Sequence, residues 1–166
     1  MEKFQTARKE ALSRIKAADH MLTQTFHLIK DPKLLISVFS NVAQGAESTM
    51  ETILFYDRMF NKIPPFHDSF PSKLHLFQNT SANLHNLKNF VPFLAKINDI
   101  SEKHKKSPVE FGRQDSFVIC DDSYGYKTLS AKDLKKIIDE AKQFYLEAEK
   151  ITRENEDIFE KRIKDE

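Results

Sequence analysis

One segment of this sequence departs from the helical pattern around it. Val109–Ser130 reads VEFGRQDSFVICDDSYGYKTLS and holds two of the three glycines, the only cysteine and two of the four tyrosines. Ser116–Cys120 and Tyr124–Leu129 are rich in β-branched and aromatic residues, and the intervening residues 121–123 are typical of a turn. The segment therefore predicts a β-hairpin. Because an isolated hairpin is marginal in water, we expect it to pack on the rest of the chain.

The remaining sequence has the apolar spacing of long amphipathic helices. Proline ends or kinks a helix because it lacks the backbone N–H, so Pro92 is expected to kink the third helix or split it in two. The pattern predicts an all-α protein: an up-and-down four-helix bundle with the hairpin (109–130) inserted between helices 3 and 4, in one domain over residues 1–166. The predicted helices are Lys3–Lys30, Pro32–Lys62, Ser69–Lys106 and Ser130–Arg162.

Composition narrows the class of protein. Apolar residues make up 40% of the chain and charged residues 31%, which is typical of a folded, helix-rich protein. A net charge of +1 gives no overall attraction to nucleic acid or membrane. The sequence has no apolar run near the roughly 20 residues that span a bilayer, and its single cysteine favours a reducing compartment. We therefore expect a cytoplasmic protein that makes no membrane contact.

The second predicted helix is unusually poor in charge. From Leu34 to Met50 the only charged residue is Glu47. A helix with few charges on any face is usually covered on more than one side. Small residues at Ala43, Gly45 and Ala46 would let another helix approach closely, so we expect a symmetric homodimer through this helix.

The sequence offers little support for catalysis. It contains no Glu-x-x-His pair, phosphate-binding glycine loop or Gly-x-Ser-x-Gly motif, and His20 and His27 share a helix face with no carboxylate between them. We expect no metal, no cofactor and no catalytic residue, and interpret Cys120 as structural. Residues 71–108 carry six lysines against two acids. They suit either a helix carboxyl terminus or a nucleic-acid patch, although the hairpin beside them is acidic.

Two polar groups of residues remain as candidate sites. Around the hairpin, an arginine, carboxylates and tyrosine hydroxyls could frame a small polar ligand or a partner, in a groove against the ends of helices 1 and 4. Alternatively, the tyrosines fix the hairpin to the bundle and the acids face solvent. These candidate ligand- or partner-binding residues are Arg113, Asp115, Asp121, Tyr124 and Tyr126.

The second group lies at the opposite end of the predicted bundle. Asp57 falls on the apolar stripe of its helix, Arg8 borders that of the first helix, and Asn155 lies within that of the last. A buried carboxylate needs a partner, so we expect an Arg8–Asp57 ion pair in a structural polar cluster with Asn155.

Several phrases of the sequence resemble an uncharacterised family of small archaeal helical proteins: AADHML, KDPKLL, IPPFHDSF and KKSPVEFGRQDSFVICDDSYGYKTLS. The predicted bundle is similar in architecture to the HEPN superfamily. HEPN ribonucleases carry Arg-x(4–6)-His at the start of a late helix. Here that spacing occurs at Arg14 and His20 in the first predicted helix, about 600° apart around its axis, so the two point to different faces.

The resemblance implies one of two functions. Some HEPN proteins act as dimeric partners of nucleotidyltransferases, a role that needs no catalytic residues. Together with the hairpin residues, this favours a non-catalytic binding or accessory module, with a protein as the expected partner. The alternative is a HEPN-type ribonuclease or nucleic-acid-binding protein.

Overall fold

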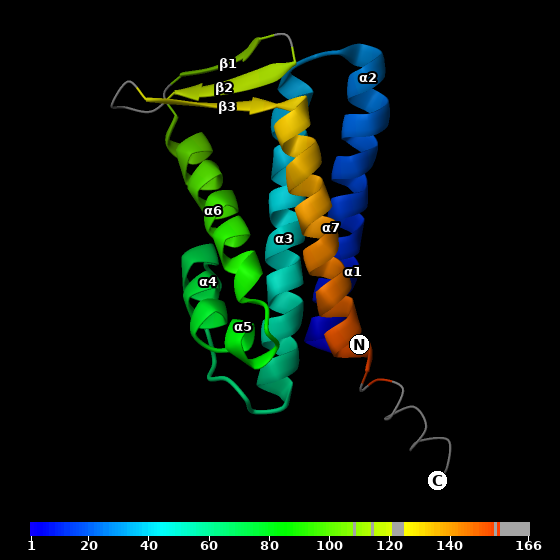
Figure 1. Cartoon of the computed structure of the whole chain (residues 1–166), viewed down its shortest axis with the longest axis vertical. Helices are drawn as coiled ribbons and strands as arrows, with labels where there is room; N and C mark the ends of the chain where they lie inside the picture. The colour runs from blue at the N-terminus through cyan, green and yellow to red at the C-terminus, as the bar shows by residue number, and fades with distance from the viewer. Residues whose placement is uncertain (108, 114, 121–124, 155, 157–166) are drawn as a thin grey trace.

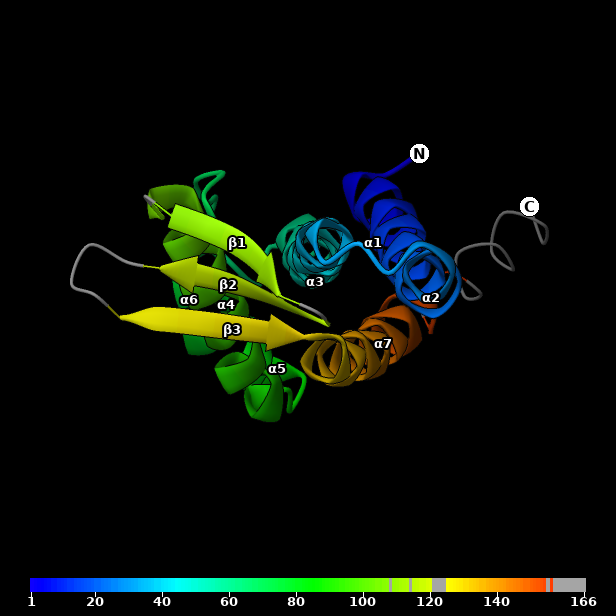
Figure 2. The same ribbon diagram turned by 90° about the horizontal axis from the view of Figure 1, so that it is seen from above.

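The helix α3 (Lys33–Met59) forms the axis on which the other elements pack (Figure 1). The computed structural model describes residues 1–107, 109–113, 115–120, 125–154 and 156. On one side of α3 lie α1 (Lys3–His20) and α7 (Ala131–Arg153), and on the other α4 (Phe70–Asn79) and α6 (Val91–Lys106); a small sheet crosses one end, as seen from above in Figure 2. The protein is thus mostly helical, as expected, with a sheet before the final helix.

The first predicted helix contains an irregular turn. After α1, residues Met21–Thr25 form a π-helical segment, and α2 (Phe26–Ile29) follows it and ends at Lys30, whose φ is +55°. A π-helix closes i→i+5 hydrogen bonds, so its wider turn changes the direction of every later side chain. This contributes to the exposure of Ile29, an apolar residue that is 63% exposed.

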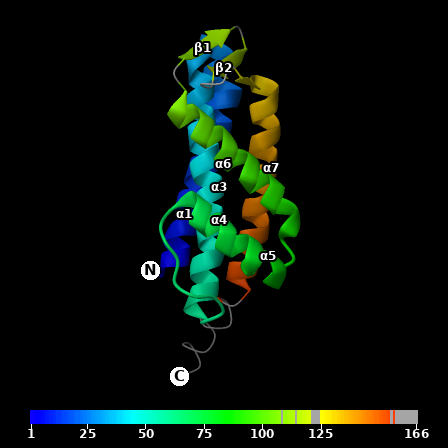
Figure 3. The same cartoon turned by 90° about the vertical axis from the view of Figure 1, so that its left-hand side faces the viewer.

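The third predicted helix is split. It comprises α4, a short α5 (Ser81–Leu84), a 3-10 turn (Lys88–Phe90) and α6. Pro92 lies in the first turn of α6, where its missing N–H costs no hydrogen bond, so the break precedes the proline. Figure 3 shows α6 crossing obliquely over α3, with α4 below it. Of the two expectations for this segment, splitting is confirmed.

The predicted hairpin is one strand short. The structure has a three-stranded antiparallel sheet in the order β1 (Val109–Arg113), β2 (Ser116–Cys120), β3 (Tyr126–Ser130). The prediction missed β1, which contains a glycine that weakens a strand pattern. A glycine is needed there because the backbone of Gly112 passes close to Pro32. A Cβ at position 112 would stand 2.6 Å from Cβ of Pro32.

The two faces of the sheet have different environments. On the inner face, Phe117, Ile119 and Leu129 are buried in the same apolar core as the helices. Phe111 is paired with Val118, one position out of step with those residues, and is therefore on the outer face, where it is exposed. The sheet thus closes one end of the core and presents its other face outward.

The charge-poor character of α3 is explained within the chain. Its buried residues meet α1 and α7 on one side and α4 and α6 on the other. Gly45 lies against α1 so closely that a Cβ there would be 2.7 Å from Cγ1 of Ile15. The small residues therefore serve an intramolecular contact, and the homodimer through this helix stays a prediction.

In the part of the chain that the structure describes, none of the helices is both long enough and apolar enough to cross a membrane.

Candidate functional site

A pocket of about 640 Å³ opens where the sheet meets the ends of two helices. One wall comes from the π-helical segment and α2, and the other from the β1–β2 turn and the start of α7. This is the location expected for a groove between the hairpin segment and the ends of the first and last helices. The lining residues are Leu22, Thr23, Phe26, His27, Lys30, Asp115 and Ala131.

Hydrogen bonds join the two parts of the sheet wall, which are the β1–β2 turn and the start of α7. The carbonyl of Asp115 accepts a hydrogen bond from the N–H of Ala131 at 3.0 Å, which joins the β1–β2 turn to the first residue of α7. Ser130 caps α7: its hydroxyl accepts from the N–H of Asp133 at 3.0 Å, and the Asp133 carboxylate accepts from the N–H of Ser130 at 3.1 Å. That backbone hydrogen bond is the main reason why the pKa of Asp133 lies below its usual range.

The charged residues of the pocket come from its two opposite walls. The helical wall contributes Lys30, together with His27, and the sheet wall contributes Asp115. The Thr23 hydroxyl donates to the carbonyl of Asp19 at 2.7 Å, so its proton is directed at the backbone of its own helix. The lining therefore combines an apolar base with a few charged groups, which is the usual character of a recognition pocket.

Ion pairs fix α1 to α7 just below the pocket. The carboxylate of Asp19 lies 2.9 Å from Nζ of Lys142 and 4.0 Å from that of Lys135. Both lysines come from α7, and Asp19 stands one turn before Thr23. These partly exposed ion pairs link the helical wall of the pocket to α7.

The strand register separates the predicted hairpin residues. Arg113 pairs with Ser116, beside Asp115 and the pocket, whereas Tyr126 pairs with Cys120 at the far end of β2. Four residues of strand separate these positions, about 13 Å at 3.3 Å per residue. Of the three residues, only Asp115 lines the pocket, while Arg113 and the 76% exposed Tyr126 belong to the outer face of the sheet. Asp121 and Tyr124 lie outside the described residues.

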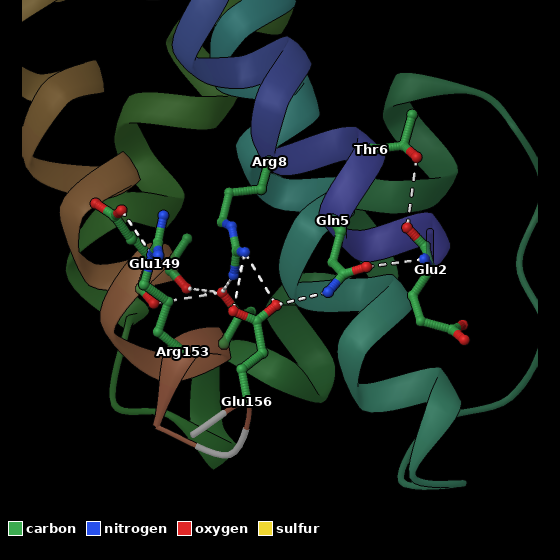
Figure 4. A network of polar contacts seen from close by, with 9 residues as sticks. Glu2, Gln5, Thr6, Arg8, Glu149, Arg153 and Glu156 are labelled. Atoms are coloured by element: carbon green, nitrogen blue, oxygen red, sulfur yellow. Dashed lines mark hydrogen bonds and ion pairs between the residues drawn. The ribbon is translucent and has the colours of Figure 1, made fainter. Parts of the chain in front are cut away.

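The predicted Arg8–Asp57 ion pair is wrong, because each residue has other partners. Arg8 donates to Thr152 at 2.9 Å and to both carboxylate oxygens of Glu156 at 2.9 and 3.0 Å (Figure 4). Arg8 and Asp57 are both buried, as expected. Among the described residues, Arg8 pairs with Glu156 and Asp57 with His85, and the two do not pair with each other. Arg8 faces α7 and Asp57 faces α5, on different sides of α3. Asn155 lies outside the described residues.

The partners of Asp57 come from a segment that was read as plain helix. Ser81 donates to Oδ2 of Asp57 at 2.6 Å, and Nε2 of His85 lies 2.8 Å from Oδ1. A signal for them was present, since Ser81 and His85 are four residues apart and share a helix face. Because both contact the carboxylate, the hydroxyl is not placed to be activated by the imidazole, and the group reads as a structural anchor.

Neither a metal site nor the nuclease motif gains geometric support. Among the described residues, no group of three or more His, Cys, Asp or Glu is arranged to hold a metal ion. Arg14 is engaged on α1 and α3: its Nε donates to Glu10 at 2.6 Å, and its guanidinium contacts Asn41 at 3.3 Å.

Comparison with known proteins adds no family. No protein-family model matches the chain, and no curated protein matches it significantly.

Proposed function

We propose that this protein is a non-catalytic binding module that recognises a protein partner at its sheet end. The observation that carries the proposal is the pocket of about 640 Å³ between the π-helical segment and the β1–β2 turn. Residues 22–30 meet Asp115 and Ala131, which are distant from them in the sequence, and π-helical turns occur frequently at functional sites. A partner side chain with an apolar body and a polar end fits this lining.

The rim of the pocket favours a protein over a free small molecule. Leu28 and Ile29, on the same turn as the lining residues of α2, are 80% and 63% exposed. Large exposed apolar side chains that border a pocket are the usual anatomy of a protein interface, where the pocket receives an anchor and the rim excludes water. Phe111, on the outer face of β1, is a further exposed apolar side chain of the sheet.

The direction of the polar groups supports binding rather than chemistry. The pocket's hydroxyl, that of Thr23, is committed to a backbone carbonyl, and it lies on the same wall as the pocket's imidazole, that of His27. A nucleophile needs a base within hydrogen-bond reach of its proton. The arrangement instead offers fixed charges of both signs for orientation of a bound group.

The test blocks the pocket without touching the core. Thr23 is exposed and lines the pocket, so Thr23→Trp places an indole across its mouth. Thr6→Trp is the matched control, since Thr6 is also an exposed threonine whose hydroxyl bonds the carbonyl four residues earlier, but at the other end of α1. Photo-crosslinking from position 28 in the native cell then identifies the partner.

We expect the same crosslinked partner with the unaltered chain and with Thr6→Trp, and its loss with Thr23→Trp. Retention of the partner in Thr23→Trp contradicts the proposal. If native mass spectrometry instead detects a small molecule that Thr23→Trp alone displaces, the pocket serves a metabolite. Deleting the sheet is a poorer test, because Phe117, Ile119 and Leu129 belong to the core.

A homodimer through α3 and a HEPN-like relationship also remain proposals. An accessory module that pairs with a second copy of itself would agree with the helical architecture. The charge-poor faces no longer argue for it, since α1, α4, α6 and α7 contact α3. Light scattering at tens of micromolar tests it: a dimer mass supports the proposal and a monomer mass refutes it.

A further inference from the structure

A further cavity, of about 360 Å³, lies at the end of the molecule opposite the sheet, where α1 begins and α3 ends (Figure 1). The loop that follows α3 forms its third wall. None of its lining residues belongs to the pocket beside the sheet, so a ligand here would be independent of the partner proposed there. The lining residues are Glu2, Lys3, Phe4, Phe55, Arg58, Met59, Pro65 and Phe66.

The apolar part of the lining is aromatic and partly open to solvent. The rings of Phe55 and Phe66 are in contact, with their centroids 5.3 Å apart, and both remain partly accessible. Met59, which lines the same space, is 40% exposed. Removal of such surface from water is favourable, so the cavity suits a ligand with an apolar body.

Two cations from different helices line this cavity without a carboxylate partner. Nζ of Lys3 lies over the Phe55 ring, 5.8 Å from its centroid, in a cation–π contact. The guanidinium of Arg58 donates to the carbonyl of Ile63 at 3.4 Å, which directs only one of its N–H groups. Among the described residues, neither Lys3 nor Arg58 forms an ion pair. Both charges are thus positioned by the protein and remain available to an anion.

Glu2 is the acidic residue of the lining. It is exposed, and its backbone N–H donates to Oε1 of Gln5 at 2.9 Å, which fixes the start of α1. One carboxylate offsets only one of the two cations, so the lining keeps a single net positive charge. A ligand with one negative charge matches that balance better than a neutral compound or a multiply charged anion.

We infer that this cavity binds an amphipathic monoanion: a carboxylate carried on a short aromatic or aliphatic body. The carboxylate would lie against Arg58, whose forked N–H groups match two carboxylate oxygens, with the ammonium of Lys3 beside it. The apolar body would cover the Phe55 and Phe66 rings and Met59. The volume lies within the range of about 300–1,000 Å³ that is usual for small-molecule sites.

The experiment compares a carboxylate with its neutral analogue on the full chain. Hydrocinnamate, hydrocinnamyl alcohol and inorganic phosphate are titrated separately by calorimetry and heteronuclear NMR, with sodium chloride added to hold ionic strength constant. We expect hydrocinnamate to bind and to shift the amide signals of Lys3, Arg58 and Phe66. The alcohol and phosphate should each bind at least about tenfold more weakly, because one lacks the charge and the other the apolar body. Equal binding of either compound, shifts confined to other residues, or no binding of hydrocinnamate would overturn the inference.

Substitutions then locate the site. Lys3→Gln and Arg58→Gln each remove one cation from an exposed position and should weaken hydrocinnamate binding about fivefold, as expected for the loss of one partly screened ion pair. Lys9→Gln is the matched control, because Lys9 is an exposed lysine of the same helix that does not line the cavity, and it should leave binding unchanged. Glu2→Gln removes the opposing charge and should strengthen binding.

Met59→Trp supplies a variant that leaves every charge in place. The larger side chain fills the cavity from a partly exposed position and should abolish hydrocinnamate binding. Binding that survives in folded Met59→Trp protein, or that falls equally in Lys3→Gln and Lys9→Gln, places the anion elsewhere and refutes the site. The partner-capture experiment at the sheet end is unaffected by either outcome.

Discussion

The imidazole of His85 lies across the carboxylate of Asp57, with Nε2 2.8 Å from Oδ1 and 3.0 Å from Oδ2. The carboxylate is fully buried in α3, and it also accepts from Ser81. Ser81 and His85 belong to the segment where α4 gives way to α6, which has few residues in regular helix. The contact therefore fixes an otherwise irregular connection to the central helix.

Removal of this carboxylate should be costly. Asp57→Ala leaves the Ser81 hydroxyl and the His85 ring without their acceptor in a buried place, so we expect a loss of about 3 kcal/mol in the free energy of unfolding. Urea denaturation measures it. Asp139→Ala, at an exposed position, should stay within about 0.5 kcal/mol of the unaltered chain. An unchanged urea midpoint for Asp57→Ala would show that the contact is dispensable.

The sequence predicted burial better than it predicted partners. Asp57 and Arg8 were correctly placed near the core because their spacing puts them on or beside apolar stripes. Their partners depend on the rotation of each helix about its axis and on the break near Thr80, and neither can be read from a stripe of apolar residues. Strand β1 was missed for a related reason. Its glycine, Gly112, weakens the strand pattern, and that glycine is explained only by its contact with Pro32, which is distant in sequence.

The close approach of α1 and α3 at Gly45 predicts an unfavourable Gly45→Ala substitution. Alanine favours helix by about 1 kcal/mol over glycine, but its Cβ would be 2.7 Å from Cγ1 and 3.3 Å from the backbone nitrogen of Ile15. Because a backbone atom cannot rotate away, we expect a net loss of about 1–2 kcal/mol. Thermal unfolding measures it, and Gln44→Ala on the exposed neighbouring position should not reproduce the loss.

A double-mutant cycle separates this contact from other effects of the substitution. Ile15→Ala removes the contacting Cγ1, so the cost of Gly45→Ala should shrink in that background. Additive costs would mean that the two helices can move apart freely at this point.

Glu156 should give the protein a pH-dependent contribution to stability. Partial burial, the largest influence, would raise its pKa, but hydrogen bonds from Gln5 and Arg8 together lower it below its ordinary value of 4.5. A carboxyl whose pKa is depressed by folding stabilises the protein above the unfolded pKa, and that stability is lost as pH falls through the folded pKa.

The comparison of Glu156→Gln with the unaltered chain measures this contribution. We expect a difference of about 1 kcal/mol at neutral pH, constant down to about pH 5 and shrinking below it. Glu154→Gln, at an exposed neighbouring position, should show no such dependence. A difference that persists unchanged at pH 3 would mean that the carboxylate charge is not the cause.

The cap of α7 should also be measurable. Ser130→Ala removes the acceptor for the N–H of Asp133 and should cost about 1 kcal/mol, whereas Ser130→Gly should cost only a few tenths. Chemical denaturation of the two variants gives the comparison. An unchanged free energy of unfolding for Ser130→Ala would mean that the hydroxyl is not a stabilising group.

The candidate pocket illustrates how far sequence reasoning could reach. The contrast between the segment 109–130 and its helical surroundings correctly indicated the end of the molecule where strands meet the helix ends. It identified Asp115, which lines the pocket, but grouped it with Tyr126, which the register places at the far end of the strand. The helical wall was missed because nothing in the apolar spacing of residues 21–25 indicates a π-helical turn.

The π-helical segment Met21–Thr25 changes the direction in which side chains point, so α1 and α2 do not continue one common helical face. In an uninterrupted α-helix, Ile29 would stand about three full turns after Ala18 and share its inward direction. The wider turn breaks that relationship, so Ala18 is buried while Ile29 faces outward. The residues that pack α1 and the residues that surround the pocket can therefore change independently during evolution. A substitution on the buried face of α1 does not alter the side chains that α2 exposes beside the pocket.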